Sequence, residues 1–124
     1  YIVVKDSNGD SDIVLGSHNI DIRRNVFFNW EGCPDHSFVM IGEDGHAHFE
    51  AYDVMIENNL MLGNATNLMR AALSIRGVRD VTFRHNTVSG DMPSQAYAMR
   101  LNIRDDNQEN ENIRFYNNMK LLSL

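Results

Sequence analysis

One phrase occurs four times in the chain, and this repeat constrains the fold more than any other feature. It reads polar, apolar, any, apolar, any, any, Asn, any, apolar. The four copies span Asn19–Asn29, Asp53–Asn64, Asp80–Gly90 and Asn112–Leu122. A short unit that cannot bury its apolar face alone must stack on its neighbours. The sequence therefore predicts a solenoid.

Each copy carries two apolar residues two positions apart, which is the spacing that puts strand side chains on one face. The pairs are Ile20 with Ile22, Val54 with Ile56, Val81 with Phe83, and Ile113 with Phe115. A short strand is expected after each copy's Asn, at Phe27, at Met61 or Leu62, and at Val88. Further strands are expected at Phe38–Ile41, Ala72–Ile75 and Ala98–Leu101. Three strands per period without a helical period predict an all-β chain, a parallel β-helix of about four coils stacked roughly 4.8 Å apart.

The repeated Asn is expected to form an internal ladder through the stack. Its members are Asn25, Asn59, Asn86 and Asn118, separated by 34, 27 and 32 residues. An Asn can adopt left-handed backbone geometry at a corner, and its amide both donates and accepts hydrogen bonds. The preceding corner should behave likewise at Asn19, Asp53, Asp80 and Asn112. A surface column of Arg23, Glu57, Arg84 and Tyr116 should form ion pairs across coils.

Other readings of single segments stay open. Ile20–Phe27 also fits the core of a leucine-rich repeat, although the longer periods of 32 and 34 exceed that family's 20–29 residues. The first residues, Tyr1–Val4, read as a strand. Asp6–Asp12 is a turn by composition, with a small cation-binding loop as the alternative, and Ile13–Leu15 is expected to be a short strand.

The NIxIRxNxF phrase and its Asn ladder resemble the right-handed parallel β-helix repeats of the pectate-lyase-like superfamily. The resemblance covers about residues 13–122. It implies a right-handed coil, a secreted or cell-surface location and polysaccharide as the partner. Two functions follow from it: part of a secreted polysaccharide lyase or glycoside hydrolase, or a non-catalytic scaffold of a surface, adhesion or filament protein. Calcium is the cofactor that the resemblance implies for a lyase.

The composition limits the classes of molecule that the protein is expected to bind. The formal charge of −6 provides no basic surface, which argues against nucleic acid and anionic membranes, and no apolar run reaches 18 residues. Cys33 is the sole cysteine, so no internal disulfide forms. We interpret residues 1–124 as one domain and as a fragment of a longer solenoid, with neighbouring coils of that chain or another subunit as further partners.

The densest ionisable segment is Gly42–Asp53, an expanded connection between two expected strands. His46 and His48 share a face at strand spacing, so with Asp44 they are the expected acid and base groups. Asp44 and Glu50 are the expected metal ligands. The alternative is an ordinary solvated loop.

Basic and aromatic residues complete the expected site. Trp30 either stacks on a sugar ring or packs onto the next coil. Arg76 and Arg104 are expected to bind substrate, and the resemblance implies a catalytic role for Arg100, because lyases of this superfamily abstract a proton with Lys or Arg. A scattered solvated face is the alternative for these arginines. The Arg104–Glu111 loop should lie on the same side as the Gly42–Asp53 segment, which we call the His-rich loop, roughly 10 Å away.

Overall fold

The structure is a computed structural model that describes residues 1–6, 16–34, 36–65, 67, 69–90 and 97–122. These residues form twelve strands and no helix. The strands are β1 (Ile2–Val4), β2 (Ser17–Arg23), β3 (Val26–Trp30), β4 (His36–Ile41), β5 (Ala51–Glu57), β6 (Leu60–Ala65), β7 (Met69–Arg76), β8 (Val78–Arg84), β9 (Thr87–Gly90), β10 (Tyr97–Asn102), β11 (Glu111–Tyr116) and β12 (Met119–Leu122).

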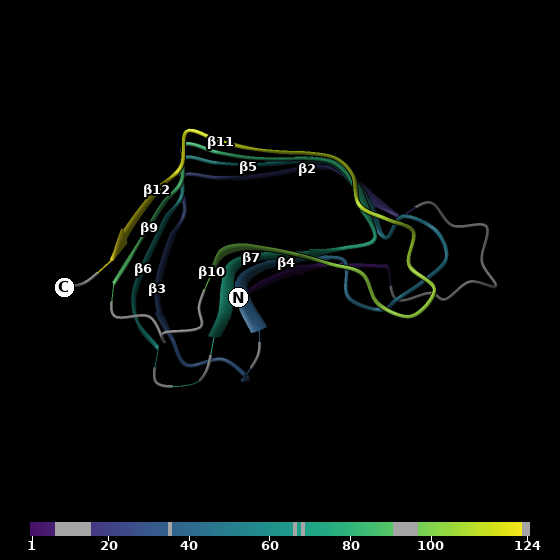
Figure 1. Ribbon diagram of the computed structural model, residues 1–124. Coiled ribbons are helices and arrows are strands. Elements are labelled where there is room, and N and C mark those ends of the chain that lie inside the picture. The colour runs from purple at the N-terminus through teal and green to yellow at the C-terminus, as the bar shows by residue number, and fades with distance from the viewer. Residues whose placement is uncertain (7–15, 35, 66, 68, 91–96, 123–124) are drawn as a thin grey trace.

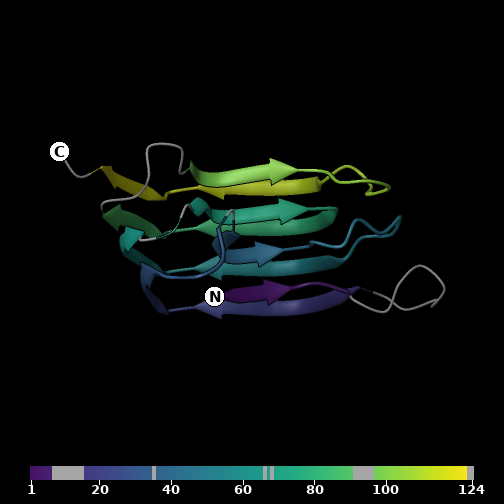
Figure 2. The ribbon, with the colours of Figure 1, turned by 90° about the horizontal axis from the view of Figure 1, so that it is seen from below.

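The strands form three parallel sheets of four strands each, and the chain visits the sheets in turn (Figure 1). Sheet A has the order β1-β4-β7-β10, sheet B the order β11-β8-β5-β2, and sheet C the order β12-β9-β6-β3. Three consecutive strands therefore make one coil, and the coils lie in layers (Figure 2). This confirms the predicted all-β repeat architecture and is compatible with a parallel β-helix. A leucine-rich repeat does not fit, because each coil supplies strands to three sheets.

Strand pairing confirms the register that the repeats predict. Ile22, Ile56, Phe83 and Phe115 occupy one column of sheet B, and the rings of Phe83 and Phe115 stack with centroids 5.2 Å apart. In sheet C, Met61 lies between Phe27 and Val88. The interior residues of the middle coils are fully buried, so each coil completes the core of its neighbours.

The Asn ladder is present and has a direction. The Oδ1 atom of Asn59 accepts hydrogen bonds from the backbone N and Nδ2 of Asn25, both at 3.0 Å. In the same way, Oδ1 of Asn86 accepts from the backbone N and Nδ2 of Asn59 at 3.0 and 2.9 Å. Oδ1 of Asn118 accepts from the backbone N and Nδ2 of Asn86 at 2.9 and 3.1 Å. The Nδ2 atoms of Asn59, Asn86 and Asn118 also donate to a strand carbonyl of the preceding coil, as Asn59 does to Ile22 at 2.9 Å. The ladder thus satisfies backbone groups inside the stack.

The corner geometry differs in one respect from the prediction. The ladder residues are not the left-handed ones. The residue before each of them is, with φ of 52° to 55° at Arg24, Asn58, His85 and Asn117. This backbone turn aims the following Asn inward, where its amide meets the neighbouring coil. The second predicted column is confirmed, since Asn19, Asp53, Asp80 and Asn112 have φ between 50° and 55°.

The predicted charged column also forms. Glu57 contacts Arg23 at 3.4 Å and Arg84 at 2.6 Å, and Arg84 donates to the Tyr116 hydroxyl at 3.1 Å. The hydrogen bond from Arg84 lowers the pKa of the Glu57 carboxyl.

The expected first strand is confirmed as β1. Of the predicted turn at Asp6–Asp12 only Asp6 lies within the described residues, and the predicted strand Ile13–Leu15 lies outside them. Within the described ranges there is no helix that could span a membrane.

The ladder predicts the effect of replacing Asn59 by Asp. A carboxylate would face the Ile22 carbonyl and the Asn86 Oδ1 atom, two acceptors that the Asn59 amide now satisfies. We expect Asn59→Asp to lower the free energy of unfolding at neutral pH by at least about 3 kcal/mol, measured by denaturant titration.

The matched control is Asn25→Asp, at the exposed end of the same ladder. Water can solvate that carboxylate, so the loss should be well under half as large. Equal losses at the two positions would contradict a buried ladder.

Candidate functional site

The ionisable residues gather where the chain passes from sheet A to sheet B, a region that we call the A–B edge. It comprises Lys5 and Asp6 after β1, Gly42–Glu50 between β4 and β5, Gly77 between β7 and β8, and Ile103–Asn110 between β10 and β11. Figure 1 shows these connections together on the right of the molecule. In the third coil the connection is the single residue Gly77, whose φ of 54° makes a tight turn.

Asn107 joins the long connections of the second and fourth coils across this short turn. Its Nδ2 donates to the His46 carbonyl at 3.1 Å and to Glu50 Oε1 at 3.2 Å. A Cβ atom on Gly77 would lie 2.5 Å from the same nitrogen, so only glycine leaves room for it. The Arg104–Glu111 loop therefore lies on the predicted side, and it contacts the His-rich loop directly because Gly77 leaves a gap between them.

Glu50 organises the His-rich loop from inside. Its side chain is fully buried, and its Oε2 accepts from the backbone N–H groups of Glu43 at 2.8 Å and Asp44 at 2.9 Å. Its Oε1 accepts from Gly45 N–H at 2.8 Å and from Asn107. Burial by itself raises the pKa of this carboxyl, but the four hydrogen bonds outweigh it and hold the pKa below its usual value.

The residues expected to bind calcium do not fit a cation. Four N–H donors already point at the Glu50 carboxylate, and the Asp44 carboxylate lies 3.1 Å from the Lys5 ammonium. A cation needs oxygen ligands that face it together. Across the residues that the structure describes, no group of three or more His, Cys, Asp or Glu side chains could hold a metal ion.

His48 and Asp6 form a close acid–base contact at the A–B edge. Nε2 of His48 lies 2.7 Å from Oδ2 of Asp6. The ring of His46 is parallel to that of His48, with centroids 5.4 Å apart, although the two residues lie in a loop and not on the strand that the prediction assumed. The His48 side chain is about one-third exposed while Asp6 is buried. A buried carboxylate that holds an accessible imidazole is an arrangement suited to proton transfer.

Lys5 adds a cation beside this pair. Its ammonium contacts Glu43 and Asp44, each at 3.1 Å. The hydrogen bonds to Asp44 and then Glu43 raise the pKa of Lys5, so it stays protonated. Asp44 is therefore an ion-pair partner at the rim of the loop, next to the two histidines.

The other expected site residues lie apart from the histidines or inside the protein. Trp30 is 3% exposed, and its ring packs against Tyr1 and Phe38 with centroids 5.2 and 6.0 Å away. It would have to leave the core to meet a sugar, so core packing is the interpretation that fits. Arg100 lies on sheet A in register with Ser74, and not at the A–B edge.

The two remaining arginines lie at the A–B edge. Arg76 ends β7, and its Nε is buried without a hydrogen-bond partner among the described atoms. Arg104 pairs with Asp105 at 3.0 Å, and its carbonyl lies 3.3 Å from where a Cβ on Gly45 would be. The structure thus brings Asp44, His46, His48, Glu50 and Arg104 into one region.

The sequence did not point to Lys5 and Asn107, and it indicated Asp6 only as part of a turn or cation-binding loop, not as a partner of the histidines. Lys5 and Asp6 directly follow β1, and Val4 pairs with Ile41, after which the His-rich loop begins. Aligning these strand ends would have placed both residues beside the loop. Asn107 offered no comparable signal, because its contact depends on the length of the turn at Gly77.

Comparisons with known proteins found no match from which a role for this site could be inferred. No family model, no curated protein and no solved structure matches the chain.

The buried, hydrogen-bonded carboxylate of Glu50 predicts how the stability of the protein depends on pH. Because its pKa is lower in the folded protein, its carboxylate contributes stability that is fully present above the unfolded-chain value of about 4.3. That contribution is lost as the pH falls through the folded-state pKa. We expect Glu50→Gln to cost at least about 2 kcal/mol at pH 7, since an amide cannot accept from all four donors.

The measurement is denaturant unfolding of both proteins between neutral and acidic pH. The difference between them should shrink as the pH falls below that unfolded value. A Glu43→Gln variant, which keeps its own N–H donor to Glu50, serves as the control and should lose much less. A Glu50→Gln protein as stable as the parent at pH 7 would contradict this role.

Proposed function

We propose that the chain belongs to a right-handed parallel β-helix of the pectate-lyase-like kind and that it acts on polysaccharide outside the cell. Three parallel sheets visited in turn and an internal Asn ladder support the fold part of this proposal. The repeat's resemblance to that superfamily supports the substrate class. A polysaccharide lyase or glycoside hydrolase is the activity that we assign to the A–B edge.

The contact between His48 and Asp6 carries the proposal. With the proton on Nε2 donated to Asp6, Nδ1 of His48 is the basic atom of the ring. The buried carboxylate orients the imidazole and stabilises the imidazolium that forms when it takes a proton. An oriented histidine base typically contributes a factor of about 10²–10⁴ to the rate of proton transfer. Abstraction of the proton next to a uronate carboxyl, with cleavage of the glycosidic C–O bond on the neighbouring carbon, would form a carbon–carbon double bond. The leaving sugar oxygen would take a proton from water, which completes the elimination of a lyase.

The surroundings of the pair suit a polyhydroxylated ligand. The ring of His46 stacks on that of His48 with its Nε2 atom buried, and the Lys5 ammonium lies against the same loop, where Glu43 and Asp44 balance its charge. Sugar hydroxyl and carboxylate groups are recognised by donors of this kind. Glu50 and Asn107 hold the loop that bears both histidines, so they act as positioning residues.

The test is a cleavage assay on a panel of neutral and uronate polysaccharides, read both by new reducing ends and by ultraviolet absorbance of unsaturated products. We expect His48→Ala to lose activity by about 10²-fold or more, and Asp6→Asn by a smaller factor. His18→Ala is the matched control, because His18 stacks on Tyr52 on the outer face of sheet B and should leave cleavage unchanged.

The pattern of losses decides between the assignments. Cleavage that survives His48→Ala would overturn the site, and the ultraviolet signal separates a lyase from a hydrolase. Silence of the parent protein across the panel would overturn the enzymatic assignment.

A non-catalytic scaffold is the second candidate, and one observation favours it. Trp30, a candidate for stacking on a sugar, lies in the core, and Arg100, a candidate catalytic residue, lies on sheet A. Neither is beside the histidines. In that case the Glu50 and Asn107 hydrogen bonds serve only to close a long loop. Binding of polysaccharide without turnover, unaffected by His48→Ala, would favour this function.

A further inference from the structure

The connection between β10 and β11, residues Ile103–Asn110, reaches the His-rich loop two coils away. We call this connection the strap. We propose that the strap opens and closes on the His-rich loop, that Asn107 is its latch, and that closing it holds the two histidines in their working positions. The regulatory part of this inference rests on the proposed function, whereas the movement of the strap does not.

The strap is seated on two glycines. At Gly77, an added Cβ atom would lie 2.5 Å from Nδ2 of Asn107. At Gly45 in the His-rich loop, it would lie 3.1 Å from Oδ2 of Asp105 and 3.3 Å from the carbonyl oxygen of Arg104. The φ angles of Gly77 and Gly45 are 54° and 84°, a region that favours glycine. The strap therefore fits a surface that larger residues would fill.

The side chain of Asn107 ties the tip of the strap to the His-rich loop. Its Nδ2 atom donates to the His46 carbonyl at 3.1 Å and to Glu50 Oε1 at 3.2 Å. Its Oδ1 atom accepts from the Arg104 N–H group at 3.1 Å and so shapes the turn of the strap. One amide thus forms the tip and fastens it.

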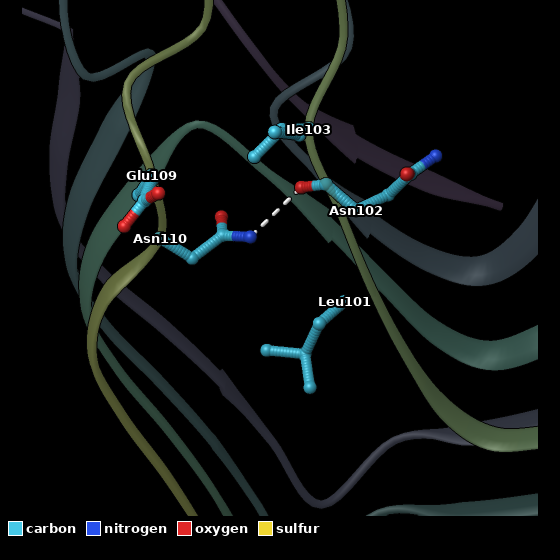
Figure 3. Close-up of a pocket in the computed structure, with 5 residues that line it drawn as sticks. All are labelled: Leu101, Asn102, Ile103, Glu109 and Asn110. Carbon is cyan, nitrogen blue, oxygen red and sulfur yellow. Dashed lines mark hydrogen bonds between the residues drawn. The ribbon is translucent and has the colours of Figure 1, made fainter.

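The base of the strap is held separately by Asn110. Its Nδ2 atom donates to the Asn102 carbonyl at 2.8 Å, which joins the two arms of the strap (Figure 3). Its Oδ1 atom accepts from the Val78 N–H group at 3.2 Å and so ties the base to the third coil. The base can therefore stay in place when the tip lifts.

The tip has little buried surface to hold it down. Its exposed residues are Arg104, Asp105, Asp106, Gln108 and Glu109, while Asn107 is half-buried. Segments with few buried apolar contacts open at low cost in free energy. A typical hydrogen bond changes such an equilibrium by about two- to twelve-fold. Two bonds from one amide therefore leave the open strap as a minor state that the protein can reach.

Like charge opposes the closed position. The ionisable residues of the strap are one arginine and three carboxylates, namely Arg104, Asp105, Asp106 and Glu109. The His-rich loop faces it with the carboxylates of Glu43, Asp44 and Glu50, of which Lys5 balances a part. Salt screens repulsion between exposed charges. Closing should therefore be favoured by salt, and a neutral amide at the tip is what lets the strap approach Glu50.

Closing the strap adds to the support of the histidines. Oε1 of Glu50 accepts from both the Gly45 N–H group and Asn107, so the tip strengthens the carboxylate contact that organises the loop. Asn107 also holds the carbonyl of His46, whose ring stacks on that of His48. An open strap leaves this segment with fewer constraints, so His48 would be correctly oriented for less of the time.

The test is amide hydrogen exchange of Gly45, followed by NMR in 0.01 M and 1 M salt, where the Debye length is about 30 Å and about 3 Å. Asn107→Asp keeps the size of the latch, removes its donor and places a carboxylate against Glu50. At low salt it should raise the Gly45 exchange rate at least about ten-fold, and high salt should reverse much of this increase. Asn107→Ala removes the donor without adding charge, so its increase should be smaller and less dependent on salt.

Gln108→Glu is the matched control. It makes the same change from amide to carboxylate one residue further along the strap, on an exposed side chain. The exchange rate of Gly45 should then change by less than about two-fold. Protection of the Asn59 side-chain amide, which donates within the ladder, checks that each variant still folds.

The cleavage assay links the strap to the site. His48→Ala should lose cleavage and leave Gly45 exchange within about two-fold of the parent rate. Asn107→Asp should lose cleavage at low salt and regain it at high salt, in step with Gly45 protection and relative to Gln108→Glu.

The strap and the proposed function can fail separately. Equal Gly45 exchange in Asn107→Asp and the parent, or equal increases in Asn107→Asp and Gln108→Glu, would overturn the strap whatever the cleavage assay shows. Cleavage that ignores a faster Gly45 exchange would overturn its regulatory role. A parent protein that cleaves nothing but shows the expected exchange would uphold the strap and overturn the enzymatic assignment.

Discussion

The side-chain hydrogen bonds of the buried asparagines fix the register on which the rest of this structure depends. A parallel sheet slipped by one residue would turn its apolar side chains outward, and nothing in the backbone alone prevents such a slip. Asn59 and Asn86 prevent it because each amide must meet both the next Asn and one particular strand carbonyl. Once these contacts are made, the inward columns of sheets B and C align and the core follows.

The same constraint explains why the loops can vary while the strands do not. Between two fixed coils the connection can be one residue, as at Gly77, or a long segment that folds on its own internal support. The buried Glu50 provides that support for the His-rich loop by accepting from three successive N–H groups. The short turn then gives Asn107 room to join two loops that are two coils apart. The position of His48 beside Asp6 is thus a consequence of stacking, not of neighbouring sequence.

The repeats predicted the strands, the inward columns and the ladder, because alternation and a recurring Asn are local signals that survive in any context. The same reasoning assigned the left-handed backbone to the ladder residue, when the preceding position, such as Asn58, carries it. The candidate site was predicted less well. The sequence left Trp30 open between sugar stacking and packing on the next coil, and it placed Glu50 among expected metal ligands. Burial decides both, and it depends on neighbouring coils: Tyr1 packs on Trp30, and Asn107 adds to the three hydrogen bonds that Glu50 accepts from its own loop.

The most direct test of the ladder is proton exchange of the asparagine side-chain amides, followed by NMR on the folded protein. Buried amides that donate within a ladder exchange only when the stack opens. We predict strong protection for Asn59 and Asn86, with nuclear Overhauser contacts between them, and weaker protection for Asn25 at the exposed end. Equally fast exchange at all of these side chains, or an absence of contacts between Asn59 and Asn86, would contradict the register that we describe.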